Sequence, residues 1–304
     1  MTALYAMPGN EAFSALLARH SGQLQHELQL HRFPDGESLV RVEPPAADAD
    51  AVIVCTLDHP DPKLLPLLMA AATVRELGAR RVGLIAPYLA YMRQDIRFHP
   101  GEAVSARILG QLLGSAFDWL ITVDPHLHRY RTLDEAYPLD GRVIHAAPRV
   151  VEWIRSHVES PLIIGPDSES AQWVNAVASA LGAPCVVASK DRHGDREVQV
   201  HLPGIEPWAD HTPVLLDDII ASGHTMIETL HGLDGKRMRE PVCIGVHGIF
   251  ADAAMEKLRA AGAGRIVTSN TIAGETATID ISEDVALLMG ELIDRRPATS
   301  ESTA

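Results

Sequence analysis

The feature that most constrains the fold is the regular return of short runs rich in valine, isoleucine and leucine. Eight such runs begin at Ala51, Arg81, Trp119, Pro161, Cys185, Pro213, Val242 and Arg265. Each run is a few residues long and lacks polar alternation, which is typical of strands buried on both faces. This pattern favours parallel sheets, because these are usually covered on both faces.

The segments between these runs carry apolar residues at helical spacing. The clearest examples are Val104, Ile108 and Leu112 in one segment and Val174, Val177 and Leu181 in another. A chain in which strands and helices alternate forms parallel sheets flanked by helices. We therefore predict an α/β fold.

The length of 304 residues and a turn-rich stretch near the middle indicate two domains. We place the first domain at residues 1–145, the second at 146–296 and a polar tail at 297–304. The two halves show no clear residue-by-residue repeat, so their similarity is expected to be architectural.

Charge and cysteine content exclude several functional classes. The chain has 26 basic and 40 acidic residues, a net charge of −14, which disfavours a nucleic-acid partner. Its three cysteines, which lack C-x-x-C spacing, favour a reducing compartment over a disulfide framework or a zinc site. The apolar runs are too short to span a membrane, so we expect a cytoplasmic protein without a membrane partner.

Ligands of open α/β sheets bind beyond the carboxyl ends of the strands, so the residues after each run are the candidate site. Four such segments stand out, and they are 88–95, 124–130, 167–170 and 217–225.

The strongest of these signals is the segment VLLDDIIASGHT, which ends at Thr225. Gly223 allows close approach of the backbone to an anion, and the hydroxyls of Ser222 and Thr225 add donors at a helix N-terminus. Asp217 and Asp218 can accept hydrogen bonds from vicinal ribose hydroxyls. The alternative is a Ser222 N-cap behind two solvated acids, but a strand end has no structural need for two carboxylates. We therefore predict a sugar-phosphate site.

The segment FPDGES offers the Phe33 ring for stacking and the carboxylates of Asp35 and Glu37 as acceptors for an exocyclic amine. From the residues alone, a Pro-Asp-Gly turn is favoured over an adenine site.

Two further segments carry cations. Arg93, followed by Gln94, can clamp phosphate oxygens after a strand, although a solvated arginine is the alternative. Lys190 and Arg192 lie in a polar stretch that is compatible with a mobile lid or with a charged surface hairpin.

Taken together, these segments resemble the ribose-phosphate diphosphokinases (phosphoribosyl pyrophosphate, PRPP, synthetases). HRFPDGES, PYLAYMRQD, TVDPHLH, PDSES, SKDRHGDREV and VLLDDIIASGHT occur in the family's order along the chain. The segment IRFHPGEAVSARI, which follows Asp95, is closer to the archaeal-type pattern than to the basic bacterial one. Ala221 and Ser222 stand where the bacterial enzymes carry Asp and Thr.

The resemblance implies two tandem type I phosphoribosyltransferase-like domains and Mg²⁺-dependent transfer of the diphosphoryl group of ATP to ribose 5-phosphate. It implies an ATP site with Phe33, Asp35, Glu37, Arg93, Gln94, Asp95 and His126. It implies a ribose 5-phosphate site with Asp217, Asp218, Ala221, Ser222, Gly223, His224 and Thr225. Lys190 and Arg192 would be catalytic, and His126 and Asp167 would lie near the metal.

The resemblance further implies a homo-oligomer of at least a dimer, because family members share the nucleotide site between subunits. Two alternatives stay open. One is a catalytically silent regulatory paralog, and the other is a phosphoribosyltransferase that consumes PRPP.

Overall fold

The computed structural model describes residues 2–127, 129–167, 170–193 and 197–295. Contacts within the chain divide it into two units. The first unit holds Met1–Ile144 and the C-terminal segment from Ser282 on, and the second holds His145–Ile281. Each unit contains one six-stranded sheet in which all paired strands run parallel, and the predicted α/β fold is therefore confirmed.

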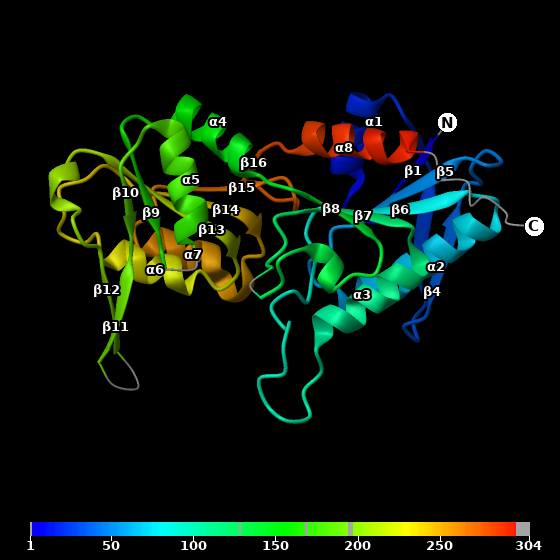
Figure 1. The fold of residues 1–304 in the computed structure, drawn as a ribbon, viewed down its shortest axis with the longest axis horizontal. Coiled ribbons are helices and arrows are strands. Elements are labelled where there is room, and N and C mark those ends of the chain that lie inside the picture. Colours follow the sequence, from blue (N-terminus) through cyan, green and yellow to red (C-terminus); the bar gives the residue numbers. More distant parts are fainter. Residues whose placement is uncertain (1, 128, 168–169, 194–196, 296–304) are drawn as a thin grey trace, which may run out of the picture. The chain divides into compact units, whose positions relative to one another are not determined.

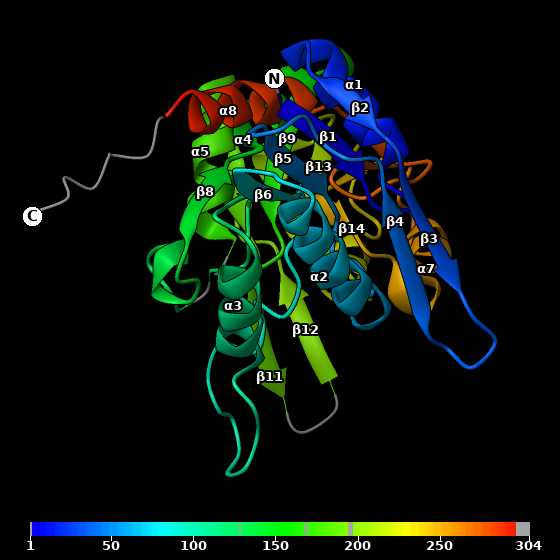
Figure 2. The same cartoon turned by 90° about the vertical axis from the view of Figure 1, so that its right-hand side faces the viewer.

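The sheet of the first unit has helices on both faces. In sheet order its strands are β2 (Leu24–His26), β1 (Thr2–Ala6), β5 (Asp50–Val54), β6 (Arg81–Ala86), β7 (Trp119–Val123) and β8 (Asp140–Ile144). The other elements are α1 (Glu11–Ser21), β3 (Leu28–Arg32), β4 (Ser38–Val42), α2 (Asp61–Glu76), α3 (Ser105–Ala116), the 3₁₀ turn η1 (Leu133–Glu135) and α8 (Ser282–Asp294). Helices α1 and α8 cover one face, and α2 and α3 cover the other (Figures 1 and 2).

The second unit repeats this topology. In sheet order its strands are β10 (Cys185–Val187), β9 (Pro161–Gly165), β13 (Thr212–Ile220), β14 (Val242–Gly248), β15 (Arg265–Ser269) and β16 (Ala277–Ile279). The other elements are α4 (Ala147–His157), α5 (Ala171–Leu181), β11 (Ser189–His193), β12 (Glu197–His201), η2 (Glu206–Trp208), α6 (His224–His231), η3 (Ala251–Ala253) and α7 (Ala254–Ala260). In both units an antiparallel hairpin, β3–β4 or β11–β12, follows the edge strand.

The position of the C-terminal helix differs from the predicted domain division. Residues 282–296 were expected in the second domain, but α8 belongs to the first unit and lies beside α1 (Figure 1). It occupies the place that α4 takes beside α5 in the second unit. The division between the two units follows Ile144.

A polar anchor holds the end of α8 in the first unit. The Arg81 guanidinium donates to the carbonyl oxygens of Leu292 at 3.2 Å, Ile293 at 2.8 Å and Arg295 at 2.9 Å. It also pairs with Asp50, whose side chain is 1% exposed. Burial of the Asp50 carboxyl is unfavourable for its charged form, but hydrogen bonds from Arg81 and Arg80 outweigh this and lower its pKa. The helix end therefore meets a cation, as its macrodipole favours.

All eight apolar runs form strands, namely β5, β6, β7, β9, β10, β13, β14 and β15. The two helices predicted from spacing are α3 and α5. In α3, however, Ile108 and Leu112 are exposed, and the buried side includes Leu109 and Leu113.

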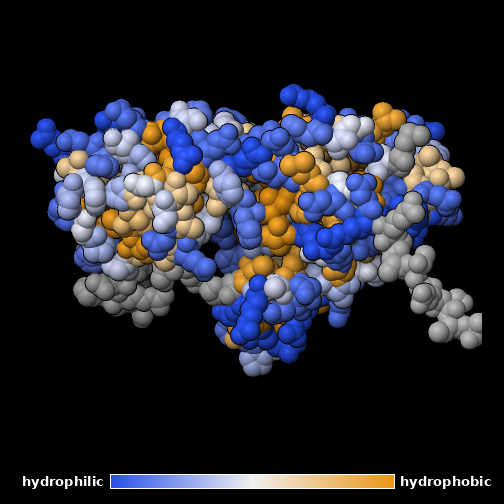
Figure 3. Space-filling view, turned by 45° about the horizontal axis from the view of Figure 1, so that its top comes forward, coloured by the Kyte–Doolittle hydropathy of each residue, from blue (hydrophilic) through white to orange (hydrophobic). Residues whose placement is uncertain are grey.

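The molecular surface is mostly hydrophilic on the face shown in Figure 3, where apolar residues form separate patches. Among the residues that the structure describes, no helix combines the length and the hydropathy needed to cross a bilayer.

Candidate functional site

The parallel topology brings the four candidate segments together in pairs, one pair in each unit. In the first unit β6 and β7 are neighbours, so the segments 88–95 and 124–130 leave the same edge of the sheet. In the second unit β9 and β13 are neighbours, and the segments 167–170 and 217–225 likewise share an edge. Each unit therefore presents one group of candidate residues at the carboxyl edge of its sheet.

In the second unit, strand β13 leads through a short loop into α6. Asp217 and Asp218 lie near the end of the strand, and both are half-buried. Gly223 adopts φ 70° in front of α6, and a Cβ atom there would lie 3.3 Å from the Leu258 side chain. A glycine is thus required both by the left-handed backbone and by the close packing. The His224 N–H at the start of α6 donates to the hydroxyl of the exposed Ser222 at 3.4 Å. The N–H groups in the first turn of a helix can bind an anion.

The acids of this edge interact strongly. Burial, together with the charges of Asp218 and Asp167, raises the pKa of Asp217 to about 8. The Asp217 Oδ1 atom accepts a hydrogen bond from the Asp218 N–H at 3.0 Å. The edge therefore carries a surplus of negative charge, which hydroxyl donors or a cation would stabilise.

The loop after β13 rests on a segment that the sequence did not reveal. The Ile220 carbonyl oxygen accepts hydrogen bonds from the N–H groups of Ile249 and Phe250, each at 3.0 Å. Just beyond, Phe250, Asp252 and Ala253 have φ of 49°, 54° and 57°. Left-handed backbone is strained for residues other than glycine and collects at functional sites. No sequence signal announces it, because none of these residues is a glycine.

In the first unit, the segment after β6 places its residues in different environments. Arg93 is exposed, and Gln94 is half-buried with its Oε1 atom 3.5 Å from the Ser105 hydroxyl. Asp95 has a side chain only 1% exposed, and Arg129 donates to its Oδ1 atom at 2.8 Å. Arg93 is therefore available to an anionic ligand, whereas the Asp95 carboxylate faces another residue of the protein.

The tip of the β3–β4 hairpin carries Phe33, Asp35 and Glu37. The Phe33 N–H donates to the Glu37 carbonyl at 2.8 Å, and the Glu37 N–H donates to Asp35 Oδ1 at 3.1 Å. The segment thus forms the turn that its residues alone favour, with the Phe33 side chain 40% exposed. The hairpin projects from the rest of its unit, so an external ligand can reach the tip (Figure 2).

The residues predicted near a metal lie at strand ends. His126 is half-buried after β7, and Asp167 is half-buried after β9, with its Oδ1 atom accepting from the Ser170 N–H at 3.1 Å. Within residues 2–127, 129–167, 170–193 and 197–295, no group of three or more His, Cys, Asp or Glu residues is arranged to hold a metal. The half-buried Asp167 offers the carboxylate oxygens that Mg²⁺ prefers, and Mg²⁺ takes most of its other ligands from phosphates and water.

The predicted catalytic cations lie on strand β11 of a hairpin. The β11 backbone pairs Lys190 with Val200 and Arg192 with Val198 on β12. The side chains of Lys190 and Arg192 lie outside the described residues. The backbone agrees with the hairpin alternative for this segment.

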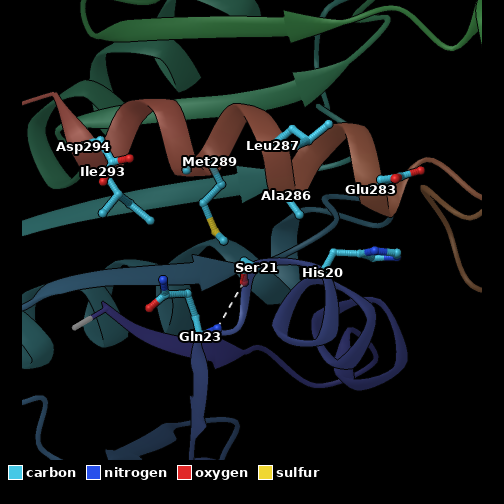
Figure 4. Close-up of a pocket in the computed structure, with 10 residues that line it drawn as sticks. His20, Ser21, Gln23, Glu283, Ala286, Leu287, Met289, Ile293 and Asp294 are labelled. Carbon is cyan, nitrogen blue, oxygen red and sulfur yellow. Dashed lines mark hydrogen bonds between the residues drawn. The ribbon is translucent and has the colours of Figure 1, made fainter.

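One cavity of about 330 Å³ lies between α1 and α8, as Figure 4 shows. His20, Gln23, Glu283 and Met289 are among its lining residues, and none of the lining residues is a candidate site residue. The Ser21 hydroxyl, which also lines it, donates to the Leu17 carbonyl and accepts from the Gln23 N–H. Since none of its lining residues is a candidate site residue, this cavity is separate from the candidate site.

Comparison with known proteins identifies both units. Residues 2–116 match the N-terminal domain of ribose phosphate pyrophosphokinase, and residues 142–279 match the phosphoribosyl transferase domain. A ribose-phosphate pyrophosphokinase of Methanobrevibacter smithii is 30% identical over 91% of this chain and 97% of that protein. One from Methanopyrus kandleri is 33% identical over 84% of this chain and 87% of that protein.

A solved structure agrees with the fold. The phosphoribosylpyrophosphate synthetase of Mycobacterium smegmatis superposes with a TM-score of 0.83, covering 96% of this chain and 98% of that one, at 22% sequence identity. The fold and the two matched domains define a protein built from two phosphoribosyltransferase-like units. More particularly, this chain belongs to the ribose-phosphate pyrophosphokinase family.

Proposed function

We propose that the protein is a ribose-phosphate diphosphokinase that converts ATP and ribose 5-phosphate into PRPP and AMP. The observation that carries the proposal is the end of β13, where Asp217 and Asp218 precede the loop that Gly223 closes onto a helix start. A pair of acceptors next to an anion-binding backbone matches the hydroxyls and the phosphate of one pentose phosphate. Membership of the family supports ATP as the second substrate.

In the second unit, Asp217 and Asp218 hold the 2- and 3-hydroxyls of ribose 5-phosphate. The segment of Ala221, Ser222, Gly223, His224 and Thr225 holds the 5-phosphate. A carboxylate that has accepted hydroxyl hydrogen bonds is easier to keep ionised, so sugar binding lowers the cost of the charge that crowds this edge.

In the first unit, Arg93 binds phosphate oxygens of ATP, and Gln94 and His126 contribute polar contacts. Phe33, Asp35 and Glu37 hold the adenine, with the Phe33 ring stacking on its face. In this proposal the hairpin tip reaches the nucleotide of a second subunit, so the active protein is a homo-oligomer of at least a dimer.

The reaction is an in-line displacement. The 1-oxygen of ribose 5-phosphate bonds to the β-phosphorus and loses its proton, while the bond from that phosphorus to the α,β-bridging oxygen breaks and AMP leaves with the bonding electron pair. Lys190 and Arg192 stabilise the charge that develops on the moving diphosphoryl group. Mg²⁺, with His126 and Asp167 near it, supplies charge neutralisation on the ATP oxygens when bound.

The test is phosphorus NMR of the purified protein with ATP, ribose 5-phosphate and MgCl₂. Equal formation of AMP and an anomeric diphosphate is the expected result. Consumption of added PRPP with a nucleobase, with ATP left intact, would assign the chain to the phosphoribosyltransferases. No turnover in either assay would assign it to the silent regulatory paralogs.

If Lys190→Ala abolishes the activity but retains ATP binding, the turnover belongs to this chain. Unchanged trace activity in that variant would reveal a contaminant and refute the assignment.

A further inference from the structure

An ion pair in the first unit joins the two segments that carry the proposed nucleotide-binding residues. The Arg129 guanidinium, beyond β7, donates to the Asp95 carboxylate, beyond β6, with 2.8 Å between Nη1 and Oδ1. A second bond joins the same segments, because the Tyr130 hydroxyl donates to the Asp95 carbonyl oxygen at 3.2 Å. Asp95 is thus held through both its side chain and its backbone.

The burial of Asp95 separates it from the groups that can meet a ligand. Its side chain is 1% exposed, while the neighbouring Arg93 is exposed and Gln94 is half-buried. A carboxylate at this depth cannot touch a nucleotide unless the segment rearranges. Its burial therefore favours a role other than direct contact of the carboxylate with ATP.

The same arginine also steadies the loop between Asp95 and α3. Its Cζ atom lies 5.5 Å from the centre of the Phe98 ring. That loop is closed by Glu102, whose carboxylate accepts from the N–H groups of Phe98 at 3.0 Å and His99 at 2.9 Å. Arg129 is therefore the point at which this loop, Asp95 and the segment after β7 meet.

The second carboxylate oxygen of Asp95 also makes this residue depend on Arg129. Within the described part of the chain, the Asp95 Oδ2 atom is buried and has no hydrogen-bond partner. A buried carboxylate with one oxygen unsatisfied depends strongly on the single cation that the other oxygen meets. Loss of the Arg129 contact would leave this charge uncompensated and would shift the backbone on either side of it.

We propose that Asp95 and Arg129 are positioning residues for the nucleotide, which fix Arg93 and Gln94 relative to His126 without touching ATP themselves. This inference rests on the proposed ATP site in the first unit. The geometry of the ATP site then depends on the Asp95–Arg129 pair. The family resemblance alone implies that Asp95 is an ATP ligand, and it gives Arg129 no role.

The primary test is binding of Mg-ATP by calorimetry to full-length Asp95→Asn, Arg129→Met and the double variant. Each single variant should weaken ATP binding about 10- to 100-fold, the effect of displacing binding groups by roughly 1 Å. The double variant should be no weaker than the worse single one, because both remove one interaction. Arg131→Met and Asp134→Asn, which alter exposed residues of the following segment, are the matched controls and should bind as the wild type does.

Kinetics separate positioning from a general structural role. The KM for ATP should rise in both single variants, while the KM for ribose 5-phosphate stays within about two-fold of the wild type, because that site lies in the other unit. Arg129→Lys keeps the charge but not the two-pronged guanidinium, so it should recover part of the lost affinity. If Arg129→Met fails to fold, Arg129→Lys takes its place in the binding and kinetic measurements.

Two results would overturn the proposal. One is ATP affinity within two-fold of the wild type in a folded Asp95→Asn protein, because Arg129 would then act alone, for instance as a direct phosphate ligand. The other is an additive loss in the double variant. If the wild type binds Mg-ATP but forms no PRPP, the proposed function fails, and the ATP affinities alone decide whether the pair positions the nucleotide.

Discussion

The crowding of acids at the end of β13 predicts that this site lowers the stability of the unliganded protein. We consider Asp217→Asn, which removes the ionisable carboxyl group but keeps an Oδ1 atom that can accept the Asp218 N–H. The pKa of Asp217 rises from its usual 3.8 to about 8 in the folded protein, since the residue is buried beside two other acids. At pH 7 this corresponds to roughly three pKa units, or at most about 4 kcal/mol of folding free energy.

The sign of the pH dependence follows from proton uptake. Between pH 4 and 8 the unfolded chain has lost the Asp217 proton while the folded chain keeps it, so the stability of the wild type falls as pH rises. In Asp217→Asn this fall in stability with rising pH is absent. The free energy of unfolding of the variant should therefore exceed that of the wild type by a margin that grows from about pH 4 to about pH 8 and is constant above.

The measurement is urea unfolding of both proteins at several pH values from 5 to 9, with EDTA and without substrates. The exposed Asp234, in the same unit, provides the control variant Asp234→Asn. A margin for Asp217→Asn that is the same at pH 5 and pH 8 would refute the reasoning. A second check is Asp218→Asn, which removes one cause of the raised pKa and should reduce the pH dependence that Asp217 produces.

Three further predictions test other parts of the structure. Arg81→Met should lower the free energy of unfolding by about 1–3 kcal/mol, because it leaves the buried Asp50 carboxylate with Arg80 as its partner and removes the donors to the end of α8. Limited proteolysis should then cut α8 earlier, and equal melting and cleavage would show that the helix is held otherwise. Gly223→Ala forces a side chain into left-handed backbone against Leu258, so it should raise the KM for ribose 5-phosphate about 10-fold or more, which an unchanged KM would contradict. Ala253→Gly relieves strained backbone and should raise stability by up to about 1 kcal/mol, whereas Ala176→Gly, at an exposed position inside α5, should lower it by a similar amount; thermal melting of both distinguishes strain relief from a generic effect of glycine.

Local patterns in the sequence predicted eight of the twelve strands that form the two sheets of the described residues. The run from Ala51 and its seven counterparts became strands because a continuous apolar stretch can be buried on both faces only inside a covered sheet. The position of the candidate residues at strand ends followed from the same argument. The sheet strands β1, β2, β8 and β16 and the hairpin β3–β4 were not predicted. Strands β2 and β16 have three residues each, too few for an apolar pattern to distinguish them from a loop.

Motifs identified the candidate residues, but they did not predict which group each side chain contacts. The glycine and hydroxyl residues after β13 lie at a helix start as expected, because a glycine loop before a helix is a local structure. Asp95 lies in a motif with Arg93 and Gln94, but its carboxylate is buried against Arg129, which is distant in sequence. No local pattern reports such a partner.

The sequence by itself therefore determined the α/β class, eight of the strands in the two sheets and the segments at their carboxyl ends, because each of these depends on residues that are neighbours along the chain. Only the tertiary structure decided that α8 returns to the first unit, that Ile108 and Leu112 face outward on α3, and that three acids crowd the end of β13. These features depend on contacts between distant segments. Their energies come from burial and charge pairing that exist only once the sheets have formed.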